Sequence, residues 1–179
     1  EMGTACVILT DNKLKCWGYN SNGELGVGDT TNKNSPTEIS FTGRYAVDVS
    51  CGESHCCVVL DDGNVRCSGK GHSGRTGYGN TDDRNTYGPN VELPSGKKAI
   101  RISCNIYNTY VTFSDGTATS WGDNSQFRLG YSSSDDVGDS PNEMGDNLSL
   151  IAFSTTVSFI DSFYNTRACL LYTSDAADE

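Results

Sequence analysis

A segment of about 50 residues recurs along this chain, and the recurrence constrains the fold more than any other feature of the sequence. The string CVILTDNKLKCWG (residues 6–18) aligns without a gap on CVVLDDGNVRCSG (57–69), which begins 51 residues later. A third copy, YVTFSDGTATSWG (110–122), follows after a further 53 residues. Self-similarity at such a period predicts a repeat architecture, in which every copy folds into the same small unit.

Each unit contains four short segments with the sequence pattern of β-strands. In the second unit AVDVSC (46–51) alternates apolar and polar residues, CVVL (57–60) is apolar throughout, and NVRC (64–67) returns across a turn. A closing segment then contains a proline, which an edge strand tolerates. The closing segments are SPTEI (35–39), GPNVEL (88–93) and SPNEM (140–144). Four strands per unit and this period predict an all-β chain that folds as a partial β-propeller, with about three four-stranded blades.

The hairpin inside each unit closes through a short turn that fixes which residues face each other. DDG (61–63) and SDG (114–116) fit a three-residue loop whose glycine is left-handed, and the first unit places Asn12 in this loop. Counting outwards from residues 61–63 pairs Cys57 with Cys67. Directly opposed antiparallel residues lie about 4.5–5.5 Å apart at Cα, which overlaps the geometry of a disulfide.

Four cysteines occupy these facing positions in the first two units. The disulfide candidates are Cys6, Cys16, Cys57 and Cys67. The third unit lacks both members of the pair and has Tyr110 and Ser120 in their places. This paired loss favours two disulfides over the alternative, four reduced and buried thiols. Disulfides are typical of oxidising compartments, so we expect an extracellular or cell-surface location.

Three further cysteines have no such pattern. Cys51 and Cys104 occupy equivalent positions in successive units, and Cys56 corresponds to Ala5 and Thr109. We interpret them as small buried residues that line the propeller. The seven cysteines before residue 169 form an odd number, so at least one is free or pairs outside this sequence.

The composition and the two ends of the sequence restrict the classes of partner. The formal net charge of −10 at pH 7 disfavours binding to a nucleic-acid backbone. No apolar run reaches the roughly 18 residues of a membrane span, and no signal-peptide pattern is present. The sequence begins with Glu1 rather than Met, and we expect it to be a fragment. Residues 169–179 (CLLYTSDAADE) resemble the translated read-through of a sequencing-library adapter, so we interpret them as a non-native tail.

Several motifs recur in phase in the units. They are G-x-x-H at 52–55, L-x-D-G at 60–63, C-W-G-x-N at 16–20 and L-G-x-G at 25–28, followed by a polar loop and a proline. This set resembles the repeats of the regulator of chromosome condensation family. The resemblance covers almost all of residues 1–168 and implies a seven-bladed β-propeller. The units present would be about 1–51, 52–104, 105–162 and the start of a fourth. The sequence departs from the motifs at Ser68, Gly71, Asn105 and Phe127.

The chain has no pattern of catalytic residues. His55 occupies the histidine position of the family motif, where it is expected to pack and to form hydrogen bonds, and His72 lies in a Gly- and Ser-rich loop. No nucleophile elbow, phosphate-binding loop or zinc spacing is present. We therefore predict no enzyme activity, no cofactor and no metal site.

The polar loops are the expected site of function. Functional contacts usually lie on loops that a rigid scaffold presents, and the variable segments are 29–35, 80–88 and 131–140. The residues that we expect to contact a partner are Asp29, Asn32, Asn34, Asp82, Asp83, Arg84, Asp135 and Asp136. The first hypothesis is a non-catalytic scaffold on a secreted or cell-surface protein that binds a protein of unknown identity, without nucleic acid.

Two other hypotheses remain open. In the second hypothesis the chain is the ectodomain of a larger receptor kinase-like enzyme. A downstream apolar span with kinase motifs in the complete reading frame would support this hypothesis. The third is a guanine nucleotide exchange factor-like regulator of a small GTPase inside the cell. Free thiols at the four hairpin cysteines would exclude the extracellular location and favour the third hypothesis.

Overall fold

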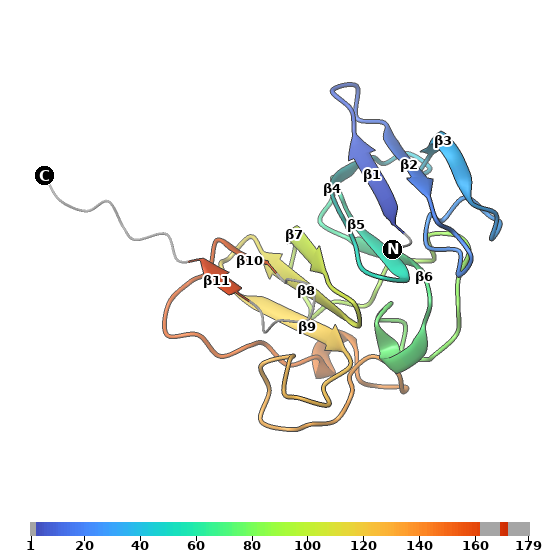
Figure 1. Cartoon of the computed structure of the whole chain (residues 1–179). Coiled ribbons are helices and arrows are strands. Elements are labelled where there is room, and N and C mark those ends of the chain that lie inside the picture. The colour runs from blue at the N-terminus through green and yellow to red at the C-terminus, as the bar shows by residue number, and fades with distance from the viewer. Residues whose placement is uncertain (1–2, 162–168, 172–179) are drawn as a thin grey trace, which may run out of the picture.

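The computed structural model describes residues 3–161 and 169–171, and three successive three-stranded antiparallel sheets form most of this part (Figure 1). We call the sheets blades one, two and three. Blade one contains β1 (Thr4–Ile8), β2 (Leu14–Gly18) and β3 (Lys33–Ile39); blade two contains β4 (Ala46–Cys51), β5 (His55–Leu60) and β6 (Val65–Gly69); blade three contains β7 (Ala99–Cys104), β8 (Asn108–Phe113) and β9 (Ala118–Gly122). Short 3₁₀ helices, η1 (His72–Gly74) and η2 (Gly145–Asn147), lie in the loops. The predicted all-β partial propeller is confirmed.

The hairpins have the register that the turn residues predict. Gly63 and Gly116 have φ angles of +85° and +77°, and Asn12 has +64°, so the last turn residue is left-handed in all three blades. Leu60 donates its backbone N–H to Asn64 O at 2.8 Å, which closes a three-residue loop. The pairing of β5 with β6 consequently sets Cys57 opposite Cys67.

The prediction of four strands in every blade is wrong, because each blade has three strands in the described residues. Within this part of the chain blade one has no strand equivalent to β4, and it is the one blade whose closing segment forms a full strand. There β3 pairs with β2. In blade two the closing segment makes two separate backbone hydrogen bonds to β6, from Val91 N to Val65 O (2.8 Å) and from Gly88 N to Cys67 O (3.2 Å). In blade three Ile151 N donates to Ala118 O (2.9 Å). The predicted closing segment of the third unit, 140–144, forms turns and bends instead, and residues 150–151 take its place.

A tyrosine hydroxyl explains this difference between the blades. Tyr78 Oη lies 2.9 Å from Cys67 N and 3.1 Å from both Cys67 O and Pro89 O, so it stands between β6 and the closing segment. Tyr131 occupies the same place in blade three, between Ser120 and the segment that follows. The corresponding residue of blade one is Val27, which has no hydroxyl, and there the two strands pair directly.

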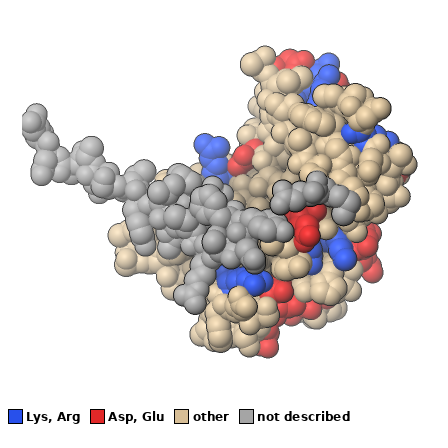
Figure 2. Space-filling model, in the orientation of Figure 1, with Lys and Arg blue, Asp and Glu red and all other residues tan. Residues whose placement is uncertain are grey.

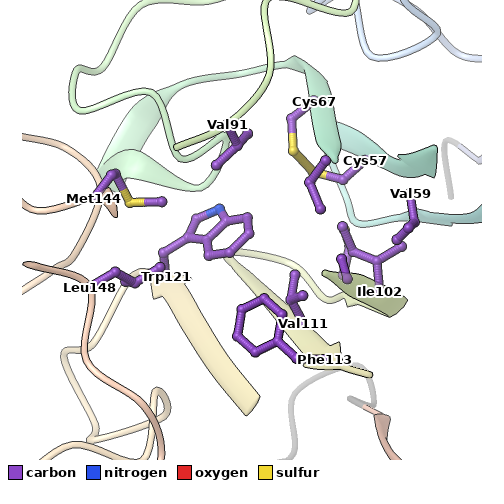
Figure 3. Close-up of a cluster of buried hydrophobic side chains, with 13 residues drawn as sticks. Cys57, Val59, Cys67, Val91, Ile102, Val111, Phe113, Trp121, Met144 and Leu148 are labelled. Carbon is purple, nitrogen blue, oxygen red and sulfur yellow. A yellow bond between two sulfur atoms is a disulfide. The ribbon is translucent and has the colours of Figure 1, made fainter. Parts of the chain in front are cut away.

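Two hydrophobic clusters hold the blades together. The first interface, between blades one and two, contains Leu14, Cys16, Leu25, Ile39, Phe41, Ala46, Val58 and Leu60. The second interface, between blades two and three, is shown in Figure 3 and contains Cys57, Val59, Val65, Cys67, Val91, Ala99, Ile102, Cys104, Val111, Phe113, Trp121, Met144 and Leu148. Hydrogen bonds also join β4 and β7, which we call the inner strands of blades two and three. Asp48 Oδ2 accepts the N–H of Ile102 (2.9 Å), and Ser50 Oγ accepts that of Cys104 (2.9 Å).

In each interface one aromatic ring packs against an equivalent glycine, Gly26 in the first and Gly77 in the second, and we call the space beside this glycine the slot. The two rings come from different places in the sequence. Trp121 of β9 is fully buried against Gly77, whose Cα approaches the indole so closely that a Cβ would lie 2.8 Å from Nε1. At the equivalent Gly26 a Cβ would collide with the ring of Tyr87, a loop residue. Blade two has Ser68 at the Trp121 position, so Tyr87 replaces the missing tryptophan.

The start of a fourth unit lies at the end of the described chain. β10 (Phe159–Asp161) lies beside β7 and β8 and pairs with β11 (Cys169–Leu171). β11 falls inside the segment 169–179 that we interpret as non-native; this pairing does not reveal the origin of the segment, so that interpretation stays a prediction. Residues 172–179 lie outside the described residues.

Candidate interaction face

The long loops of the three blades leave from the same ends of the strands. They follow β2, β6 and β9, opposite the short hairpin turns, and we call their surface the long-loop face: residues 19–32, 70–88 and 123–140. Each loop begins with the same pair of turns. In the first loop Gly23 N donates to Asn20 O and Gly26 N donates to Gly23 O, both at 3.0 Å. The backbone is left-handed at Gly23 and Gly74 and also at Phe127, despite its side chain.

A repeated contact ties each loop back to its start. Asn32 Oδ1 accepts the N–H of Asn20 (2.9 Å), Asp83 Oδ1 accepts that of Gly71 (2.9 Å), and Asp136 Oδ1 accepts that of Asn124 (2.8 Å). The two residues of each pair are 12 positions apart. Three of the residues that we expected to contact a partner therefore hold the loops in shape, and their constant spacing from the start of the loop is the sequence signal for this role.

The asparagine of the C-W-G-x-N motif organises the interior of the loop. Asn20 is fully buried, donates to Asp29 O (2.9 Å) and accepts the N–H of Leu25 (2.9 Å). Asn124 makes the same contacts with Ser133 O (2.7 Å) and Leu129 N (3.0 Å). Blade two has no room for this side chain, because a Cβ on Gly71 would collide with the backbone carbonyl of Asp82.

The other expected contact residues have mixed roles. The carboxylate of Asp29 accepts Thr31 N at 2.8 Å and pairs with Lys33 Nζ at 2.7 Å, and the Lys33 ammonium lowers the pKa of this carboxyl below its usual value. The guanidinium of Arg84 stacks over the Tyr78 ring at 4.3 Å. The exposed side chains that remain for contact are those of Asp82 and Asp135 on the long-loop face and of Asn34, which lies in β3.

The loops also support one another across the blades. Gly28 N donates to Asn85 O (2.7 Å), and Asn85 Nδ2 donates to Gly28 O (3.0 Å), which joins the first loop to the second. The second loop meets the third at Gly74, where a Cβ would collide with the backbone of Gly138 and Asp139. The long-loop face is therefore one continuous surface on a rigid support.

A groove of about 820 Å³ lies between the second long loop, with the closing segment of blade two, and residues 141–147, which follow the third long loop. Arg84 and Tyr78 line it from the second loop, and Pro141, Met144 and Asp146 line it from the segment that follows the third. Figure 2 shows acidic and basic side chains interspersed on the visible face, without a field of one sign.

The two histidines lie in different environments. His55 is fully buried, and its Nε2 lies 2.9 Å from Thr109 Oγ1. Thr109 in turn donates to Arg75 O (2.9 Å), which also accepts Trp121 Nε1 (3.0 Å), so the imidazole links blade two to blade three as a neutral donor. Burial lowers the pKa of His55 to about 3. His72 is exposed beside Ser73 Oγ, 3.0 Å from its Nδ1.

The described part of the chain contains three disulfides. Cys6–Cys16 and Cys57–Cys67 are the two that the hairpin register predicts. The pairing of Cys51 and Cys56 could not be predicted from the sequence: β4 pairs with β5 so that these cysteines face each other, and they form a third disulfide. Cys104 is a buried free thiol, and burial raises its pKa to about 12.

The fold also gathers sulfur and nitrogen ligands that are far apart in the sequence. One ligand atom from each of His55, Cys57 and Cys104 lies within 4.8 Å of the others, although no zinc spacing predicts this group. Cys57 is held in a disulfide, so its sulfur is not available as a thiolate ligand in this state. The absence of a metal site stays a prediction.

Sequence comparisons agree with the repeats and the fold. The regulator of chromosome condensation (RCC1) repeat matches residues 11–59 and, in a second form, 46–75. The X-linked retinitis pigmentosa GTPase regulator of Homo sapiens is 31% identical over 127 residues, which are 70% of this chain and 12% of that protein. The ultraviolet-B receptor UVR8 of Arabidopsis thaliana is 32% identical over 133 residues, 73% of this chain and 30% of that protein.

Solved structures share the fold at low sequence identity. Prp20p of Saccharomyces cerevisiae superposes with a TM-score of 0.71 and 18% identity, over 92% of this chain and 40% of that one. Human WBSCR16 superposes with a TM-score of 0.69 and 19% identity, over 89% of this chain and 40% of that one. The fold is thus that of a β-propeller repeat protein. The chain belongs to the RCC1-like repeat proteins, and it spans less than a third of the curated relatives described above.

Proposed function

We propose that this chain is part of a non-catalytic propeller scaffold that binds a protein partner through the long-loop face. The main support is that the three loops are held by the same side-chain-to-backbone hydrogen bond, which Asn32, Asp83 and Asp136 accept, while the exposed residues of the loops differ. A common support with variable exposed side chains is how loop-based binding sites are built. The name of the human relative describes that protein as a GTPase regulator, which agrees with a role in protein interaction.

The partner-binding test compares two pairs of charge reversals. Asp82→Lys with Asp135→Lys changes exposed residues of the long-loop face, and Asp11→Lys with Asp115→Lys changes exposed residues of the short turns at the opposite ends of the strands. Proteins crosslinked to the 179-residue chain in its native tissue would be quantified by mass spectrometry. We expect the first pair to lose a partner that the second pair retains. Equal retention by both variants would refute the long-loop face as the binding site.

We further propose an extracellular or cell-surface location, which the three disulfides support. The chain would then be part of a secreted protein or, as an alternative, the ectodomain of a receptor kinase-like enzyme. The complete reading frame decides between these two by the presence of a membrane span and kinase motifs. In the described residues no helix is long and apolar enough to cross a membrane.

A second candidate is an intracellular regulator of a small GTPase, which the name of the human relative, a GTPase regulator, favours. The thiol state of the protein from its source separates this candidate from the extracellular one. Trapping with an alkylating reagent before extraction should leave Cys6, Cys16, Cys57 and Cys67 unmodified outside the cell. Complete alkylation of these four residues would favour the intracellular regulator.

A further inference from the structure

Equivalent cysteines lie close together at both blade interfaces. Cys6 Sγ of β1 lies 3.6 Å from Cys51 Sγ of β4, in the next blade. The equivalent residues one unit later are Cys57 of β5 and Cys104 of β7, whose sulfur atoms lie within 4.8 Å. In each interface a cysteine that belongs to a hairpin disulfide therefore lies close to a cysteine on the inner strand of the following blade.

The two contacts differ in the state of the inner cysteine. Cys51 is bonded to Cys56, so four sulfur atoms at the first interface form two disulfides. The residue equivalent to Cys56 is Thr109, whose Oγ1 lies 3.8 Å from Cys104 Sγ and 3.9 Å from Cys57 Sγ. Cys104 consequently keeps its thiol next to an intact disulfide.

We propose that Cys104 and the Cys57–Cys67 disulfide form an intramolecular thiol–disulfide exchange site. Cys104 Sγ attacks Cys57 Sγ, the Cys57–Cys67 bond breaks as the Cys57–Cys104 bond forms, and Cys67 leaves as a thiolate. The proton that Cys104 gives up ends on Cys67. One disulfide and one thiol are present before and after the step, so no oxidant or reductant is consumed.

The exchange changes what the disulfide connects. Cys57–Cys67 joins β5 to β6 within blade two, whereas Cys57–Cys104 would join blade two to blade three across the second interface. Cys57 is the sulfur attacked because it lies in the group with Cys104. The thiolate is the attacking species, and burial keeps Cys104 protonated at neutral pH, so the exchange is slow there and its rate should rise about ten-fold per pH unit.

The test uses the 179-residue chain with Cys169→Ser, which leaves Cys104 as the one thiol beside the three disulfides. The folded protein is kept at pH 7.5 or 8.5, quenched in acid, unfolded with N-ethylmaleimide, and mapped by mass spectrometry. We expect label at Cys67 as well as Cys104, a linked Cys57–Cys104 peptide, and about ten-fold faster appearance at the higher pH.

Two variants make the test specific. Thr109→Cys copies the Cys51–Cys56 pair into blade three, so it should consume the Cys104 thiol and abolish label at Cys67. Cys67→Ser frees Cys57, and oxidised glutathione should then form the Cys57–Cys104 bond, which tests the geometry if Thr109→Cys does not fold. Label confined to Cys104 at both pH values would overturn the proposal. Label spread over Cys6, Cys16, Cys51 and Cys56 would also overturn it, because it indicates general unfolding.

Discussion

The two blade interfaces are built from the same positions of the repeat and are nevertheless filled differently. The first interface takes its aromatic ring from Tyr87, in a loop, and the second takes it from Trp121, in a strand. Ser68, at the position of Trp121, donates to Glu24 O (2.8 Å), just as the indole donates to the equivalent Arg75 O (3.0 Å). The repeat thus preserves a slot and its carbonyl acceptor, and the residue that fills the slot is free to change.

The glycine that lines the slot explains this freedom. Gly26 and Gly77 both have left-handed backbones and stand against the ring, so the backbone shape defines the space. Close packing then requires some side chain of suitable volume, because an empty slot would be a cavity. Sequence position matters less than volume, and a loop residue supplies the ring when the strand residue is small.

The largest expected effect is the loss of Trp121. Trp121→Ala should lower the free energy of unfolding by about 3–5 kcal/mol, since the fully buried indole leaves a cavity and Arg75 O loses a donor. Trp17, at the matching position of blade one, is only half-buried, so Trp17→Ala should lower it by about 1–2 kcal/mol. Denaturant titration followed by circular dichroism measures both. Equal losses would show that the slot of the second interface does not depend on the indole.

The two fillers can be exchanged in a double-mutant cycle. Tyr87→Ala should destabilise the first interface by about 3 kcal/mol, and Ser68→Trp should add about 1–3 kcal/mol of strain, because two rings cannot share one slot. The double variant should be more stable than the sum of the single effects by about 1–3 kcal/mol. The same denaturant titration gives the coupling. Additive effects would mean that the tyrosine and the introduced tryptophan occupy different spaces.

The repeat alignment predicts the features that depend on neighbours in the sequence. It gives the blades, the left-handed turns and the hairpin disulfides, because a three-residue turn fixes which strand residues face each other. It misses Cys51–Cys56, since the connection at 52–55 lacks the L-x-D-G pattern that made the other registers countable. That connection has four residues, so the three-residue count used for the other hairpins would have paired Cys51 with His55 instead of Cys56.

The remaining features depend on side chains that meet across long stretches of chain. The Tyr78 hydroxyl lies between Cys67, 11 residues away, and Pro89 and interrupts the strand pairing there; nothing in a strand pattern encodes this contact. Tyr87 reaches Gly26 of another blade, 61 positions earlier in the sequence. The loop-shaping role of Asn32, Asp83 and Asp136 could have been predicted, because each follows the start of its loop by 12 residues in all three blades.

A smaller effect distinguishes the interfaces by pH. His55 connects blade two to Thr109 of blade three, and its pKa of about 3 in the folded protein is below the value of about 6.5 in the unfolded chain. Protons therefore bind the unfolded state more readily, and the stability present above pH 6.5 is lost as the pH falls towards 3. Between pH 7 and pH 4.5 the loss should be about 2–3 kcal/mol, at about 1.36 kcal/mol per pH unit.

His55→Asn provides the matched control for this pH dependence. Asn108 occupies the equivalent position in blade three, where its amide donates to Asp123 O, so asparagine suits the site and does not titrate. Both proteins are unfolded with urea at pH 7 and at pH 4.5. The free energy of unfolding of the parent should fall between these pH values, and the fall should be smaller by about 2 kcal/mol in the variant. An unchanged acid loss would assign it to carboxyl groups instead of the imidazole.

The smallest predicted effect converts the sulfur arrangement of the first interface into that of the second. Cys56→Thr places at the first interface the residue that the second has at Thr109, and it releases Cys51 as a thiol. Loss of this short crosslink should lower the free energy of unfolding by about 2 kcal/mol. Full reduction by dithiothreitol is the control, because it should bring the unfolding free energies of parent and variant to within about 0.5 kcal/mol of each other.

Disulfide mapping of the same Cys56→Thr variant should also find a new Cys6–Cys51 bond with label on Cys16, since the sulfur atoms of Cys6 and Cys51 already lie 3.6 Å apart. Absence of that bond would mean that contact between sulfur atoms at an interface does not suffice for exchange, and that Thr109 and its neighbours make the second interface special.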